Sequence, residues 1–215
     1  MLSRYYSELE KQIQETIDLC DKNSPIERQF LLKIIDFVLR NSNRSQGIFG
    51  QNYILIFDYE FVDNDGKVVD DGDVLDYTGE LHKKKFIRID YCGFEELNFN
   101  RFIEIKPQFK VQNKSNIKKY FLLDFGVFLY KKGRNQFNKE LIKKFSIECD
   151  GYEFHSEKEH IIKDNIRNRK ILEQDFHTIR YLGREIKNLT DDDIFTLLDI
   201  LFQEKKGERL ILKRT

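Results

Sequence analysis

Apolar residues recur every three or four positions in four stretches of the chain, a spacing typical of amphipathic helices. These stretches cover residues 3–21, 25–40, 156–175 and 190–202. The second opens with Ser24-Pro25-Ile26-Glu27, which combines a Ser N-cap, a first-turn Pro and a Glu three residues after the cap. The fourth opens with Thr190 and three Asp residues, which predict a capped helix start.

Between these helices, alternating or continuous apolar runs predict β-strands. The expected strands cover residues 53–62, 68–69, 86–91, 102–106, 120–130, 145–155 and 176–182. The short fourth run should end at Pro107, since Pro cannot donate to a sheet ladder. The pattern predicts a mixed α/β fold with a central mixed β-sheet flanked by helices. The last strand follows a helical crossover, so it should lie parallel to a strand of the preceding hairpin.

The hairpin between Tyr120 and His155 carries acids where buried strands usually have none. Asp124 lies in its first run, and Glu148 and Asp150 lie in its second. Glu148 and Asp150 should point the same way, because side chains alternate along a strand. If Asp124 lies opposite, three carboxylates converge and need a hard divalent cation between them. A structural role for any single acid remains the simpler alternative.

These residues resemble the restriction-endonuclease-like PD-(D/E)xK nucleases, in the branch of very-short-patch repair endonucleases and related endonuclease domains. The resemblance rests on four motifs in this order: Pro107-Gln108 before Asp124-Phe125, Ile147-Glu148-Cys149-Asp150-Gly151 with His155, Lys163-Asp164 with Arg167 and Arg169, and Ile179-Arg180 with Gly183 and Glu185. It implies a restriction-endonuclease-like core at residues 101–204, joined by the second helix of an N-terminal region at residues 1–43. Residues 44–100 would then be a β-rich insertion, and residues 205–215 a tail.

The function implied by the resemblance is that of a Mg²⁺-dependent endodeoxyribonuclease, with Mn²⁺ as a substitute, acting on DNA in restriction, repair or defence. The metal would be held by Asp124, Glu148, the backbone carbonyl of Cys149 and Asp150. His155 would serve as general acid or base, because its pKa lies near the working pH. Glu27 has two competing roles, either closing the helix cap or placing a further acid near the metal.

Four basic residues are candidates for contacts with the phosphate backbone. Three of them, Lys163, Arg167 and Lys170, lie close together on one predicted helix, and the fourth, Arg180, lies on the following strand. Arg180 could equally pair with a buried acid. Lysines and aromatic residues also alternate before and within the central hairpin, a pattern that suits either nucleic acid or a solvated loop.

The chain departs from the superfamily pattern at one position. Many members carry Lys two residues after the strand Glu, whereas this chain has Asp150 there. The assignment of a catalytic base is therefore open. A non-catalytic nucleic-acid-binding or assembly module on the same fold is the alternative function, and a nuclease acting on RNA is a third.

Charge is balanced overall and uneven locally. The chain has 37 basic and 37 acidic residues. Residues 101–182 hold 18 basic and 11 acidic residues, while residues 58–80 hold nine acidic residues and one Lys. Such asymmetry allows a basic nucleic-acid face beside an acidic one, although a mixed solvated surface would give the same counts.

The remaining composition bears on location and partners. The three cysteines are widely spaced and form no Cys-x-x-Cys pair, so we expect neither a zinc site nor disulfides, and a reducing cytoplasm fits. No apolar run approaches the roughly 20 residues of a membrane helix, so we expect no membrane partner. A homodimer or a larger DNA-processing complex is compatible with the sequence.

Overall fold

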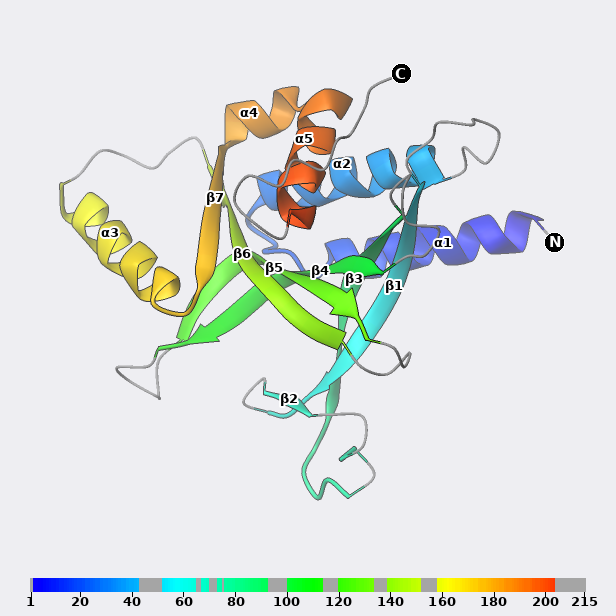
Figure 1. Cartoon of the computed structure of the whole chain (residues 1–215), viewed down its shortest axis with the longest axis horizontal. Helices are drawn as coiled ribbons and strands as arrows, with labels where there is room; N and C mark the ends of the chain where they lie inside the picture. The colour runs from blue at the N-terminus through cyan, green and yellow to red at the C-terminus, as the bar shows by residue number, and fades with distance from the viewer. Residues whose placement is uncertain are drawn as a thin grey trace.

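The computed structural model describes residues 2–42, 52–64, 67–69, 73–74, 76–92, 100–113, 120–133, 139–151 and 158–203. These ranges contain five helices: α1 (Leu2–Ile17), α2 (Pro25–Ser42), α3 (Lys158–Leu172), α4 (Gly183–Asn188) and α5 (Asp191–Phe202). They also contain seven strands: β1 (Asn52–Val62), β2 (Val68–Val69), β3 (His82–Cys92), β4 (Arg101–Gln112), β5 (Tyr120–Lys132), β6 (Lys139–Asp150) and β7 (Phe176–Leu182). Figure 1 shows their arrangement.

The seven strands form one sheet in the order β2-β1-β3-β4-β5-β6-β7. Every neighbouring pair is antiparallel except β6 and β7, which run parallel because α3 crosses between them. The predicted mixed α/β class and the parallel last strand are therefore confirmed. Strands β1 to β3, from the segment expected to be an insertion, continue the same sheet. Their status as an insertion stays a prediction.

The main hydrophobic core lies between one face of the sheet and helices α1, α2, α4 and α5, which gather on that side in Figure 1. Phe30 of α2 is fully buried at its centre. Its ring centroid lies 5.5 Å from that of Phe125 on β5 and 5.3 Å from that of Tyr181 on β7. Phe30 therefore joins α2 to the strands that carry the candidate acids.

A second, smaller core lies on the opposite face, beneath α3. Ile171 of α3 packs with Val111, Leu123, Phe128 and Phe176. Gly126 allows this packing, because a Cβ built there would lie 2.8 Å from Cγ of Phe109. The two cores fix the end of the sheet formed by β4 to β7 between α2 and α3.

Several predicted strand boundaries were wrong. Strand β4 does not end at Pro107 but continues to Gln112, and Pro107 pairs in register with Phe125. The hairpin is also longer than expected at its turn, because β5 reaches Lys132 and β6 begins at Lys139. Periodicity missed these ends because the charged side chains there pair within the sheet. Lys132 bonds Asp90, and Lys139 bonds Glu104.

No helix among the described residues is long and apolar enough to cross a membrane. The predicted tail at residues 205–215 lies outside the described residues.

Replacing Phe30 with Ala should lower the free energy of unfolding by about 3–5 kcal/mol, because it removes a buried ring and leaves a cavity. Urea denaturation measures this loss. Leu32→Ala is the matched control, since Leu32 lies on the same helix with 43% of its surface exposed. It should cost less than about 1 kcal/mol. Equal losses from both substitutions would contradict the described burial of α2.

Candidate functional site

The regular pairing of β5 with β6 ends at the pair Phe125–Ile147. Asp124 directly precedes Phe125 in β5 and lies just beyond this last pair. The carboxylate oxygen Oδ2 of Asp124 accepts a hydrogen bond of 2.6 Å from the backbone N–H of Cys149. The Asp124 carboxylate thus accepts the Cys149 N–H in place of the backbone carbonyl that would accept it if the β5–β6 ladder continued. Because Cys149 follows Glu148, the Asp124 carboxylate lies beside the peptide that joins Glu148 to Cys149.

The other neighbour of Asp124 is an irregular part of β4. Pairing passes from Pro107–Phe125 to Phe109–Leu123, so Gln108 stands opposite Asp124. Gln108 has a positive φ of 48°, a conformation uncommon for a residue with a side chain. Leu123 and Phe125 contribute to different cores although they are two residues apart. The regular alternation of side chains along β5 is therefore interrupted at Asp124, so that Leu123 and Phe125 point to opposite faces of the sheet.

Glu27 joins this site from the first turn of α2. Its side chain is 4% exposed. Its Oε2 accepts from Nε2 of Gln108 at 2.8 Å and from the backbone N–H of Asp21 at 3.1 Å. The reciprocal half of the predicted capping box does not form, because the N–H of Ser24 bonds the carbonyl of Asp21 instead. Glu27 thus points toward Gln108 of β4, and its expected place near a metal stays a prediction.

Glu148 is held from the opposite face by α3. Nη2 of Arg167 donates to Oε2 of Glu148 at 2.8 Å and also to the carbonyl of Leu122 at 2.7 Å. The other oxygen of Glu148, Oε1, is buried and has no hydrogen-bond partner among the described residues. A buried carboxylate oxygen without a donor is costly, so this atom is available to a cation or a donor on a ligand.

Asp150 points to the same side of β6 as Glu148, since Cys149 between them faces the main core. Oδ2 of Asp150 lies 3.2 Å from Nε of Arg180 on β7. Arg180 itself stands beside Glu148 in the parallel register. Asp150, the residue at which the sequence departs from the motif it resembles, thus pairs with Arg180.

Negative charge exceeds positive charge at Asp124. The pKa of Asp124 is raised to about 7, first by burial. The nearby carboxylates of Glu148 and Glu27 contribute to this rise, while the Cys149 N–H and Arg167 oppose it. Burial also raises the pKa of Glu148, although Arg167 opposes that effect. Burial is the main cause that raises the pKa of the Cys149 thiol. The thiol therefore stays protonated at neutral pH and is not a nucleophile.

The carboxylates of Asp124 and Glu148 provide negative charge that would attract a hard cation, but few ligands to bind it. Within the described ranges, no group of three or more His, Cys, Asp or Glu side chains is arranged to hold a metal. Mg²⁺, however, is often bound by one or two carboxylates together with water. Asp124, Glu148 and the carbonyl of Cys149 could provide such a site, because Oε1 of Glu148 has no other partner there.

The other predicted site residues fall into two groups. His155 lies outside the described residues, and so does the side chain of Lys163 on α3. Lys170 is described and bonds Glu173 on its own helix at 3.1 Å. The lysines of the central hairpin are also engaged, since Lys143 donates to the carbonyl of Gln203 and Lys144 to that of Gln174.

Sequence reasoning did not identify Gln108 as a site residue. Its signal was the Pro107-Gln108 pair inside an apolar run, which we interpreted as the end of a strand. A Pro within a strand often marks an irregularity, and here the irregularity directs the Gln108 side chain to Glu27.

The chain matches no known protein family model, no curated protein and no solved structure. The resemblance to restriction-endonuclease-like enzymes therefore stays a prediction based on the motifs.

The raised pKa of Asp124 makes a testable statement about stability. In the unfolded chain this carboxyl should titrate near pH ~4. Because the native state holds its proton up to about pH 7, stability should fall as pH rises through this window. Asp124→Asn mimics the protonated form, so its stability relative to the natural protein should increase by about 1–3 kcal/mol between pH 4 and pH 8.

Urea denaturation across this pH range measures the difference. Asp18→Asn, in the turn that follows α1, is the control, since it makes the same chemical change at an exposed residue. A stability difference for Asp124→Asn that does not change with pH would contradict the charge balance described above.

Proposed function

We propose that this protein is a metal-dependent nuclease that hydrolyses phosphodiester bonds in DNA. The supporting observation is a pair of carboxylates at the point where β5 and β6 part. Asp124 is half-buried and bonded to the Cys149 N–H, and Glu148 is buried with an Oε1 that has no partner among the described residues. Buried acids that lack full compensation cluster at functional sites. A cation at this point would offset the excess negative charge.

The metal would be held by Asp124, Glu148 and the Cys149 carbonyl, with Mg²⁺ or Mn²⁺ as the ion. When bound, it would neutralise charge on the phosphate and lower the pKa of a bound water. Glu27 would orient water from the α2 side, because Gln108 and the Asp21 N–H hold its carboxylate in place.

Two arginines would receive the phosphate. Arg180 has a side chain that is 36% exposed and stands beside Glu148, so its guanidinium can reach a ligand. Asp150 would orient Arg180 through their ion pair, in place of the metal-ligand role expected for it. Arg167 contacts Glu148 from the other side. Guanidinium groups match phosphate geometry well, because they donate two parallel hydrogen bonds.

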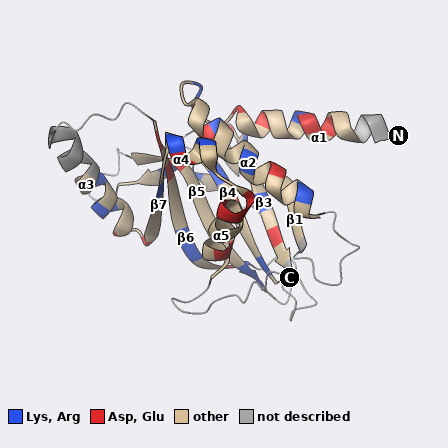
Figure 2. Ribbon diagram, turned by 90° about the horizontal axis from the view of Figure 1, so that it is seen from above, with Lys and Arg blue, Asp and Glu red and all other residues tan. Residues whose placement is uncertain are grey.

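The distribution of charge supports an anionic substrate on the α3 side of the molecule. The described side chains of α3 include Arg167, Arg169 and Lys170, whereas α5 carries four Asp residues and no basic residue. Figure 2 shows this contrast between the two helices. A polynucleotide is therefore expected to approach between α3 and β7 and away from α5.

The test is cleavage of plasmid and oligonucleotide duplexes with Mg²⁺ or Mn²⁺, compared with EDTA. Cleavage should require the metal, and Asp124→Ala and Glu148→Ala should each reduce its rate by about 10²-fold or more. Even partners in the outer shell of a metal typically change activity ~10–100-fold. Asp18→Ala, which removes an exposed acid from the turn after α1, should cleave at the natural rate.

A melting curve for each variant separates loss of folding from loss of catalysis. Full activity of folded Glu148→Ala would remove Glu148 from the proposed site. Cleavage that continues in EDTA would contradict the metal requirement. An RNA duplex of the same sequence belongs in the assay, because the acids themselves do not distinguish the sugars.

A non-catalytic DNA-binding or assembly module is the second candidate. It is favoured by the ion pair that Arg167 makes with Glu148 and by the absence of a three-ligand group within the described ranges. For this function, duplex DNA should bind equally well with and without Mg²⁺ and remain intact. Arg180→Ala should then weaken binding at low salt, since phosphate contacts are electrostatic, while Asp124→Ala should not.

A further inference from the structure

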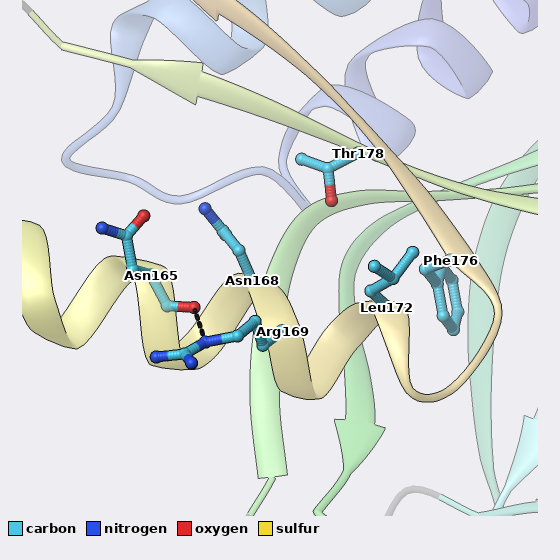
Figure 3. Close-up of a pocket in the computed structure, with 6 residues that line it drawn as sticks. All are labelled: Asn165, Asn168, Arg169, Leu172, Phe176 and Thr178. Carbon is cyan, nitrogen blue, oxygen red and sulfur yellow. Dashed lines mark hydrogen bonds between the residues drawn. The ribbon is translucent and has the colours of Figure 1, made fainter.

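A cleft lies between α3 and β7. It has a volume of about 550 Å³, within the range of ~300–1,000 Å³ usual for small-molecule sites. Figure 3 shows the six residues that line it. Four come from α3 and two from β7: Asn165, Asn168, Arg169, Leu172, Phe176 and Thr178.

The polar groups of this cleft are not fully used by the protein. Oδ1 of Asn168 is buried and has no hydrogen-bond partner among the described residues. Nε of Arg169 donates to the backbone carbonyl of Asn165 at 3.3 Å. Because a buried amide oxygen without a donor is costly, a ligand that donates to Asn168 would remove this cost on binding.

Both elements that line the cleft also carry a residue that contacts a candidate acid. On the β7 side, Thr178 and Arg180 lie on the same side of the strand about 7 Å apart, the span of two strand residues, and Arg180 pairs with Asp150. On the α3 side, Arg167, which bonds Glu148, directly precedes Asn168. The cleft therefore lies about two strand residues along β7 from the arginine that pairs with Asp150.

The side chains in the cleft suit a flat, polar ring. Asn side chains bond the N6 and N7 edge of adenine, and Arg bonds the O6 and N7 edge of guanine. Leu172, with 60% of its surface exposed, offers an apolar contact at the rim, and buried Phe176 lies beneath. Pyrimidines present a smaller ring and lack the N7 acceptor.

From this arrangement we propose that the α3–β7 cleft binds a purine base of the nucleotide next to the scissile phosphate. The inference rests on the proposed nuclease function, and it adds a base preference that the acids alone would not give. Asn168 is the central contact, with Asn165 and Arg169 at the outer edge.

The test uses dAMP, dGMP, dCMP and dTMP with the whole protein in EDTA, so that binding is measured apart from cleavage. Titration calorimetry gives the affinities, and NMR shifts of α3 and β7 amides locate the binding. Both purine nucleotides should bind at least about tenfold more tightly than either pyrimidine nucleotide. Asn168→Ala should remove about tenfold of that affinity, as expected for one good base contact.

Asn188→Ala and Arg184→Ala are matched controls, because they change exposed side chains of the same types on α4. Both should bind the nucleotides like the natural protein. Asn165→Ala provides a second variant, so that a poorly folded Asn168→Ala does not decide the result. Melting curves check the fold of each protein.

The outcomes separate this inference from the nuclease proposal. Purine-selective binding that shifts the α3 and β7 amides supports the purine site. If the protein then cleaves no DNA, only the nuclease proposal fails. DNA cleavage with no nucleotide shifts in the cleft overturns the inference and leaves the nuclease standing. Equal affinity for all four nucleotides, or unchanged affinity in folded Asn168→Ala and Asn165→Ala, also overturns it.

Discussion

The hydrogen bond from the Cys149 N–H to the Asp124 carboxylate is the interaction on which the candidate site depends. It allows β5 and β6 to separate without leaving a buried N–H unpaired, which would be costly. It also fixes a carboxylate at the point of separation. The same contact therefore ends the regular sheet and begins the site.

Packing on both faces of the sheet holds this arrangement in place. Helix α2 brings Glu27 to one side through the core around Phe30, and α3 brings Arg167 to the other through the core around Ile171. Arg167 bonds both the Leu122 carbonyl of β5 and the Glu148 carboxylate of β6. A single side chain thus ties α3 to both separating strands, and removing it would leave Glu148 as a buried charge without its partner.

Competition for Glu148 is the feature that would control the chemistry. One of its oxygens is bonded by Arg167, while the other is buried without a partner. Both a cation and an arginine are attracted to the same carboxylate, and the strength of each attraction depends on burial. The proposed nuclease and the proposed binding module differ in which of the two prevails when DNA is present.

The sequence alone predicted four of the five described helices, with α4 missed, and most of the strands. Phe30 and Ile34 lie at helical spacing and are buried as that spacing predicted. Thr190 accepts from the N–H of Asp193, as the capping pattern predicted. The crossover through α3 placed β7 parallel to β6, and alternation placed Glu148 and Asp150 on one face. These features depend on neighbours in the chain, which the sequence displays directly.

Tertiary structure alone decided how those residues meet. Glu27 bonds Gln108 from 81 positions away instead of completing its own cap. Asp150 pairs with Arg180 across two parallel strands. Lysines expected in a hairpin loop belong to strands. Lys132 and Lys139 pair there with Asp90 of β3 and Glu104 of β4, while Lys143 and Lys144 bond backbone carbonyls. Such partners depend on register and on helix placement, which arise from the packing of distant segments and leave no periodic signal in the chain.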